Sequence, residues 1–106
     1  MTIPTRPDVL SVLADGCLAG RTALVTGGGS GIGRSTALLL ARLGARVCVV
    51  GRTPEKLDET LALSAAAGHP EPMSSAVCDV REPDQVDLLL DAELAELGRI
   101  DILVNN

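Results

Sequence analysis

Residues 26–33 read T-G-G-G-S-G-I-G and separate a short apolar run from a stretch with helical periodicity. Glycine occupies five of the seven positions from 27 to 33, which is more than a turn between a strand and a helix requires. Glycine tolerates positive φ and has no Cβ, so this backbone can turn sharply and approach a phosphate, whose charge meets the N–H groups of a helix N-terminus. The segment therefore predicts a phosphate-binding turn between strand and helix, with a merely tight turn as the alternative.

Short apolar segments alternate with helical patterns along the chain from residue 21 onward. The predicted strands are 21–26, 46–51, 74–80 and 100–104, and the predicted helices are 31–43, 54–68 and 83–97. Thr53 is predicted to cap the second helix, and Pro54 suits its first position because the N–H that proline lacks has no helical partner there. Strands that alternate with helices form right-handed βαβ units on a parallel sheet, so the predicted fold class is α/β. Residues 1–19 are predicted to be a loosely ordered lead-in.

The composition excludes several kinds of chemistry. The 106 residues include no Phe, Tyr or Trp, one Lys and one His, and the formal net charge is -5. Nucleic-acid binding relies on Lys and Arg at phosphates and on aromatic stacking, so no nucleic-acid partner is expected. His69 precedes Pro70 in a loop that has no Cys or acidic ligand pattern, so it is predicted to be solvated, and no metal site is expected.

The cysteines and the shortness of the apolar segments indicate in which cellular compartment the protein resides. Cys17, Cys48 and Cys78 are odd in number, and two of them lie within apolar runs, so Cys48 and Cys78 are predicted to be buried core residues rather than disulfide partners. No segment approaches 18 apolar residues, and residues 1–16 lack the apolar stretch of a signal peptide. The sequence predicts a cytoplasmic protein without a membrane span.

A second interpretation of the glycine segment is the phosphate loop of nucleotide triphosphatases. Gly28, Gly33, Arg34 and Ser35 spell G-x-x-x-x-G-R-S, which has the right spacing. That loop needs a lysine where Arg34 stands, because a flexible ammonium reaches the terminal phosphates, and Asp79 is only a weak signal for the metal site that such enzymes need. The pattern G-x-G-x-x-G cannot be placed on these glycines, whereas T-G-x-x-x-G-x-G can. A fragment similar to these triphosphatases remains the less favoured alternative.

The pattern T-G-x-x-x-G-x-G resembles the short-chain dehydrogenase/reductase family. Three later segments agree with that family in order and spacing: V-V-G-R after the second predicted strand, C-D-V at the end of the third, and D-I-L-V-N-N in the fourth. The resemblance covers about residues 18–106. It implies a Rossmann-type doubly wound parallel sheet, here incomplete, with about four strands in the order 3-2-1-4 and helices on both faces. Residues 20–106 would then be the N-terminal half of a dinucleotide-binding Rossmann domain.

The resemblance also implies which residues bind the cofactor. The pyrophosphate and the adjoining ribose would be held by residues of the glycine segment: Gly27, Gly28, Gly29, Ser30 and Ile32. Gly31 and Gly33 would allow the helix and the strand to pack closely. Asp79 and Val80 would border the adenine, and Asn106 would lie near the ribose on the nicotinamide side.

The end of the second predicted strand bears on the choice of cofactor. An acid there usually binds the free 2′-hydroxyl of NAD(H), whereas an arginine matches the 2′-phosphate of NADP(H). This strand ends with Gly51 and is followed by Arg52, without an acid. Arg52 therefore favours NADP(H), while NAD(H) and a merely solvated arginine stay as alternatives. Many members of the resembled family that prefer the 2′-phosphate have a second basic residue at the position of Ser30, so Ser30 departs from their pattern.

The catalytic residues of the resembled family cannot be assigned. That family transfers hydride with a Tyr, a Lys in a Y-x-x-x-K arrangement and a Ser, but this sequence has no Tyr, and Lys56 lies in the second predicted helix. The expectation is the N-terminal half of an NADP(H)-dependent oxidoreductase, inactive alone, whose complete protein acts on a carbonyl, alcohol or enoyl substrate. The complete protein is expected to be a homo-oligomer. The alternative is a free-standing nucleotide-binding module without catalysis.

Overall fold

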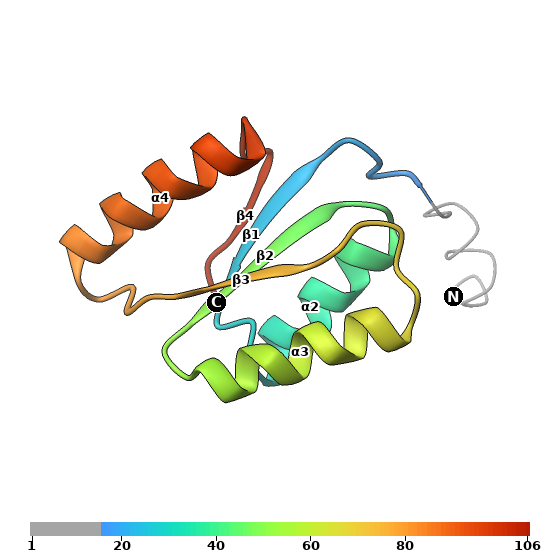
Figure 1. Cartoon of the computed structure of the whole chain (residues 1–106), viewed down its shortest axis with the longest axis horizontal. Helices are drawn as coiled ribbons and strands as arrows, with labels where there is room; N and C mark the ends of the chain where they lie inside the picture. The colour runs from blue at the N-terminus through green and yellow to red at the C-terminus, as the bar shows by residue number, and fades with distance from the viewer. Residues whose placement is uncertain (1–15) are drawn as a thin grey trace, which may run out of the picture.

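The computed structural model describes residues 16–106 as alternating strands and helices (Figure 1). The elements are β1 (Thr22–Thr26), α2 (Gly31–Arg42), β2 (Arg46–Gly51), α3 (Pro54–Ala66), β3 (Ser74–Val77), α4 (Pro83–Leu97) and β4 (Ile102–Val104). Most of the predicted lead-in lies outside the described residues. Its described part is a turn over residues 16–20, which is joined to the end of α2 by a 2.9 Å hydrogen bond from the Leu18 N–H to the Leu43 carbonyl.

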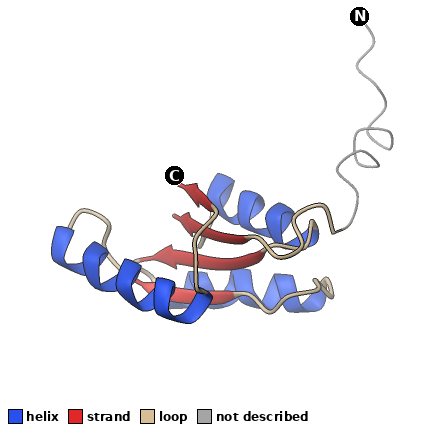
Figure 2. Cartoon of the chain, turned by 90° about the horizontal axis from the view of Figure 1, so that it is seen from above, coloured by secondary structure: helices blue, strands red, loops and turns tan. Residues whose placement is uncertain are grey.

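The four strands form one parallel sheet in the order β3-β2-β1-β4, which confirms the predicted fold class and strand order. β1 lies in the centre, with Leu24 opposite Cys48 of β2 on one side and opposite Leu103 of β4 on the other. Figure 2 shows the strands running in the same direction. The carboxyl ends of all four strands therefore meet at one edge of the sheet, where α/β proteins bind their ligands.

Helices cover both faces of the sheet, with α2 and α3 on one side and α4 on the other (Figure 1). The first core joins α2 and α3 to Ala23 and Val25 of β1 and to Val47 and Val49 of β2. The second core joins Leu89 of α4 to the alternate residues of the same strands. Because both faces are buried, the two central strands are continuous apolar runs rather than alternating ones.

Several strands and helices are shorter than predicted. β3 ends at Val77 and not at residue 80, because the last bond of this edge runs from the Cys78 N–H to the Gly51 carbonyl, where β2 itself ends. The next N–H, that of Asp79, donates to the side chain of Gln85 and turns the chain out of the sheet. β1 begins at residue 22, α2 ends at 42, α3 ends at 66, and β4 begins at 102, each one or two residues inside the predicted range.

Two local expectations are also corrected. Thr53 is the N-cap of α3, but its side chain makes no capping bond, and its backbone carbonyl accepts the N–H groups of Lys56 and Leu57 instead. His69 is half-buried rather than solvated, with its Nδ1 2.8 Å from Ser64 Oγ. Cys48 and Cys78 are buried, as predicted. None of the helices formed by residues 16–106 is both long and apolar enough to cross a membrane.

Candidate functional site

The glycine segment forms the loop between β1 and α2 at the carboxyl edge of the sheet. Gly27 and Gly31 have positive φ, at 66° and 57°, which other residues rarely adopt. A Cβ on Gly33 would lie 2.0 Å from the Gly27 carbonyl oxygen, and a Cβ on Gly28 would lie 2.6 Å from the Val49 side chain. Glycine is therefore required here both for the turn and for the close approach of α2 to the sheet.

The loop offers backbone N–H groups to a ligand. Ser30 is the N-cap of α2, and its side chain makes no capping bond. Among residues 16–106, no backbone carbonyl or side chain accepts the N–H of Gly29 or of Ser30. The first N–H groups of α2 add the positive end of the helix dipole, so this part of the molecule suits an anion.

A cleft of about 260 Å³ lies beside this loop, where the ends of all four strands meet. It brings together five of the residues predicted to contact the cofactor: Gly27, Arg52, Asp79, Val80 and Asn106. Pockets that hold a whole small-molecule ligand usually have volumes of about 300–1,000 Å³, so this cleft suits one portion of a larger ligand. Its lining comes from loops that follow β1, β2, β3 and β4, which only the sheet order brings together.

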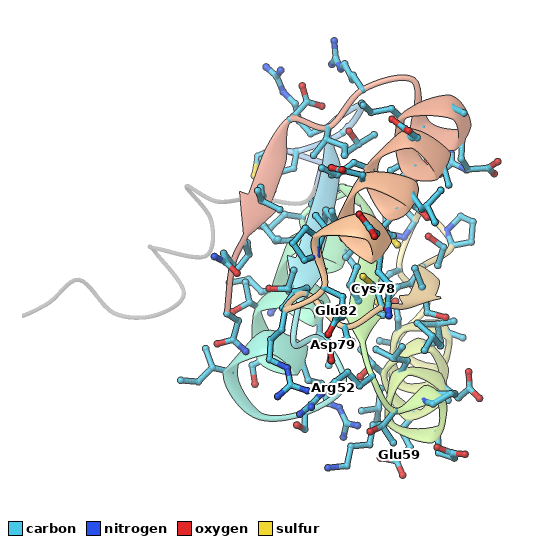
Figure 3. The ribbon with its side chains drawn as sticks, turned by 90° about the vertical axis from the view of Figure 1, so that its left-hand side faces the viewer. Arg52, Glu59, Cys78, Asp79 and Glu82 are labelled. Carbon is cyan, nitrogen blue, oxygen red and sulfur yellow. The ribbon has the colours of Figure 1, made fainter. Side chains whose placement is uncertain are left out.

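Asp79 is held as a carboxylate at the rim of this cleft. Arg81 donates to both of its oxygens, from Nε at 3.0 Å and from Nη2 at 2.9 Å. These bonds, the bond from the Arg81 backbone N–H at 3.0 Å and, to a smaller extent, the charge of Arg52 lower the pKa of Asp79 to about 2. Figure 3 shows Arg52 and Asp79 on neighbouring segments of the chain. At neutral pH the cleft therefore has an acceptor-only carboxylate beside an arginine.

Asn106 lies against the glycine loop. Its backbone N–H donates to Thr26 Oγ1 at 3.0 Å. A Cβ on Gly27 would lie 2.7 Å from the Asn106 side-chain nitrogen, so that amide occupies the space beside the glycine. The second residue after β4 is thus joined to the end of β1, and its side chain lies beside the start of the loop.

A second cleft lies between the loop and the start of α3. It is lined by Ser30, Arg52, Thr53 and Lys56, together with backbone of the glycine loop. Arg52 lines both clefts, and among the described residues no carboxylate lies within 4 Å of its guanidinium. Two cations and two hydroxyl side chains make this second cleft electropositive.

Four of the predicted site residues line neither cleft. Ile32 is 77% exposed and lines neither cleft, and Gly31 has open space around it. Gly33, in the first turn of α2, is buried against the Gly27 backbone at the start of the loop. The remaining glycine, Gly28, is buried against Val49 and donates its N–H to the Val50 carbonyl at 3.2 Å.

Sequence reasoning gave no role to Lys56, Thr60 or Arg81. A signal existed for Lys56, because a helix that begins two residues after Arg52 places its first turn beside the end of β2. The partners of Arg34 also differ from those of a triphosphatase lysine, since its guanidinium bonds to loop and α3 carbonyls rather than facing an anion site. No group of three residues of the kinds that bind metals was found among residues 16–106.

Comparison with known proteins identifies the family. Residues 21–106 match the short chain dehydrogenase family. A probable 2,4-dienoyl-CoA reductase of Caenorhabditis elegans is 41% identical over 98 residues, which are 90% of this chain and 31% of that protein. A citronellol catabolism dehydrogenase of Pseudomonas aeruginosa has a TM-score of 0.83 and 48% identity, over 88% of this chain and 38% of that one.

A third protein has been solved with a cofactor. It is a metagenomic short-chain oxidoreductase in complex with NADP, with a TM-score of 0.78 and 40% identity over 83% of this chain and 39% of that one. This chain thus spans between 31% and 39% of the length of these three proteins. The matched region includes every strand and helix described above, and the chain belongs to the short-chain dehydrogenase family.

Proposed function

We propose that this chain is the cofactor-binding part of an NADP(H)-dependent oxidoreductase that transfers hydride between the nicotinamide and a carbonyl, alcohol or enoyl substrate. One observation carries the proposal: the glycine loop, Arg52, Asp79 and Asn106 come from four different strand ends and line one cleft. The family of the chain supports the same proposal. The complete protein is proposed to be a homo-oligomer that acts on a small molecule.

The described residues fit a dinucleotide. The pyrophosphate would be held by the N–H groups of Gly29 and Ser30, which have no acceptor among residues 16–106, and by the first turn of α2. The adenine would lie by Asp79 and Val80, and the nicotinamide-side ribose by Asn106, all of which line the first cleft. When bound, the nicotinamide supplies or accepts the hydride, and the role of these residues is to bind and orient it.

Arg52 supports the choice of NADP(H) over NAD(H). Its side chain lines both clefts and has no carboxylate partner within 4 Å among residues 16–106. No acid stands at the end of β2 or directly after it to accept a hydrogen bond from a free 2′-hydroxyl. A guanidinium without a partner gains a charge-assisted bond when a phosphate arrives, whereas a hydroxyl offers it only a weak acceptor.

The test is calorimetric titration of NADPH and NADH against the wild-type chain and three variants. Arg52→Ala is expected to weaken NADPH binding about ten- to a hundredfold, as loss of a charge-assisted bond does, and to change NADH binding little. Arg42→Ala is the matched control, because Arg42 is an exposed arginine in the last turn of α2, away from both clefts. Its affinities should equal those of the wild type.

The third variant combines Gly51→Asp with Arg52→Ala and should prefer NADH, because the new acid repels the phosphate and accepts from the 2′-hydroxyl. A Cβ at Gly51 meets the flexible end of Leu57 at 3.3 Å, which can move. If Arg52→Ala weakened both dinucleotides equally, the preference for NADP(H) would be wrong. If the wild type bound neither dinucleotide, the assignment of the clefts to a dinucleotide would be wrong.

A further inference from the structure

A hydrogen-bonded chain joins the glycine loop to α2 and α3. Thr60 is fully buried, and its Oγ1 donates to the Gly28 carbonyl at 2.8 Å. The same oxygen accepts from Arg34 Nε at 2.9 Å. Because the Thr60 hydroxyl accepts from Arg34 and donates to Gly28, it couples the position of the arginine side chain to that of the loop backbone. A buried threonine whose hydroxyl is hydrogen-bonded as both donor and acceptor has one preferred side-chain orientation.

Arg34 makes the second attachment directly. Its Nη2 donates to the Gly29 carbonyl, to the Lys56 carbonyl at 3.2 Å and to Glu59 Oε2 at 3.0 Å. The side chain of Arg34 is 24% exposed, whereas that of Glu59 is 66% exposed, so the carboxylate covers the outer side of the guanidinium. Figure 3 places Glu59 at the same end of the molecule as Arg52.

These bonds determine which way two peptide groups of the loop point. In a trans peptide the carbonyl of one residue and the N–H of the next point in opposite directions, and no peptide bond in residues 16–106 is cis. The Gly28 and Gly29 carbonyls bond to side chains of Thr60 and Arg34, so the N–H groups of Gly29 and Ser30 point away from those side chains. Both of these N–H groups lack an acceptor among the described residues, so they are available to a ligand.

A loop of this composition needs such an attachment. Glycine loses more backbone freedom on ordering than any other residue, so three consecutive glycines at 27–29 would otherwise sample many conformations. A ligand that must order the loop binds more weakly than one that meets it already ordered. Side chains that order the loop before binding therefore raise the affinity without touching the ligand.

We propose that Arg34 and Thr60 are positioning residues that hold the glycine loop in its ligand-binding conformation through the carbonyls of Gly28 and Gly29. The inference rests on the proposed function, because the ligand in question is the dinucleotide. It also assigns a role to the arginine that occupies the place of a triphosphatase lysine. Arg34 stabilises the loop through its carbonyl groups, on the side opposite to the N–H groups that face the ligand, and does not contact the phosphate.

The experiment compares Thr60→Val with Thr60→Ser. Valine keeps the branched shape but removes the hydroxyl, whereas serine keeps the hydroxyl. Ser64→Ala is the control, because Ser64 is also buried on α3 and loses a hydroxyl bond to His69, but it does not contact the loop. Arg34→Lys is a second variant, since one ammonium cannot replace the planar fork that reaches both Thr60 and Gly29.

Two quantities are measured for each variant. Calorimetry gives the affinities for NADPH and NADH, and ¹⁵N relaxation gives the backbone order of Gly29 and Ser30 without ligand. Thr60→Val and Arg34→Lys are expected to weaken both dinucleotides by the same factor, about tenfold, and to lower the backbone order of the loop. Thr60→Ser and Ser64→Ala should behave as the wild type in both measurements.

The outcomes separate this inference from the proposed function. Unchanged affinity and loop order in Thr60→Val and Arg34→Lys would overturn it, as would equal effects in Ser64→Ala. A loss for NADPH alone would also overturn it, because it would indicate contact with the 2′-phosphate. If the wild type bound no dinucleotide, the proposed function would fail, whereas the relaxation data would still show whether the two side chains order the loop.

Discussion

Replacing Gly33 by alanine tests whether α2 approaches the glycine loop as closely as the structure shows. In an exposed helix, glycine to alanine stabilises by about 1 kcal/mol. Here the new Cβ would lie 2.0 Å from the Gly27 carbonyl oxygen and 2.8 Å from the Asn106 side-chain nitrogen. The first distance is roughly 1.3 Å shorter than an ordinary carbon–oxygen contact of about 3.3 Å. The obstacle is a backbone carbonyl, which cannot relieve the clash by changing rotamer as a side chain can.

The expected change in the free energy of unfolding is the difference between the cost of overpacking and the gain in helix propensity. Overpacking a filled site costs about 1–3 kcal/mol, and the rigid obstacle at Gly33 places this case at the upper end. After the gain in helix propensity is subtracted, a net loss of about 2 kcal/mol in the free energy of unfolding remains. With a urea dependence of about 1.5 kcal/mol per molar for a small domain, the unfolding midpoint should fall by about 1 M.

Urea unfolding followed by circular dichroism measures this change. Ser35→Ala is the control for helix propensity, because Ser35 is an exposed residue of the same helix, and it should be neutral or slightly stabilising. Gly31→Ala is the control for backbone strain alone, because Gly31 has positive φ but open space around it. A Gly33→Ala chain as stable as the wild type would refute the close packing of α2 on the loop.

Further expectations concern protonation, thiol reactivity and catalysis. Arg81→Ala should raise the pKa of Asp79 from about 2 toward about 3.9, as measured by carboxyl NMR titration, and an unchanged pKa would contradict the pairing. Because folding lowers this pKa, the pair stabilises the fold above about pH 4 and loses that contribution as the pH falls toward 2. Burial raises the pKa of Cys48 to about 12, so iodoacetamide should alkylate it only after unfolding, and rapid alkylation of the native chain would argue against burial. The 106 residues alone should not turn over NADPH with a carbonyl substrate, because they include no Tyr to transfer the proton, and turnover dependent on this chain would be the contrary result.

The order and type of the elements could be predicted from local patterns. Apolar runs of four to six residues, helical spacing, Pro54 and Pro83 at helix starts and Gly44 and Gly98 after helix ends are all properties of short windows. The strand order 3-2-1-4 came from the family resemblance of the motifs, and the sheet confirms it. The glycine loop was also recognisable locally, because its backbone requires glycine at positions 27 and 31 whatever surrounds it.

The tertiary structure decided what depends on partners distant in sequence. β3 stops at Val77 because β2 ends at Gly51 and offers no further backbone to pair with, which the sequence of β3 alone does not reveal. Arg34 bonds to Thr60, 26 residues later, and only the packing of α2 beside α3 brings them together. Hydrogen bonds and clefts of this kind arise from the relative placement of whole elements, whereas a sequence pattern reports the conformation of one element at a time.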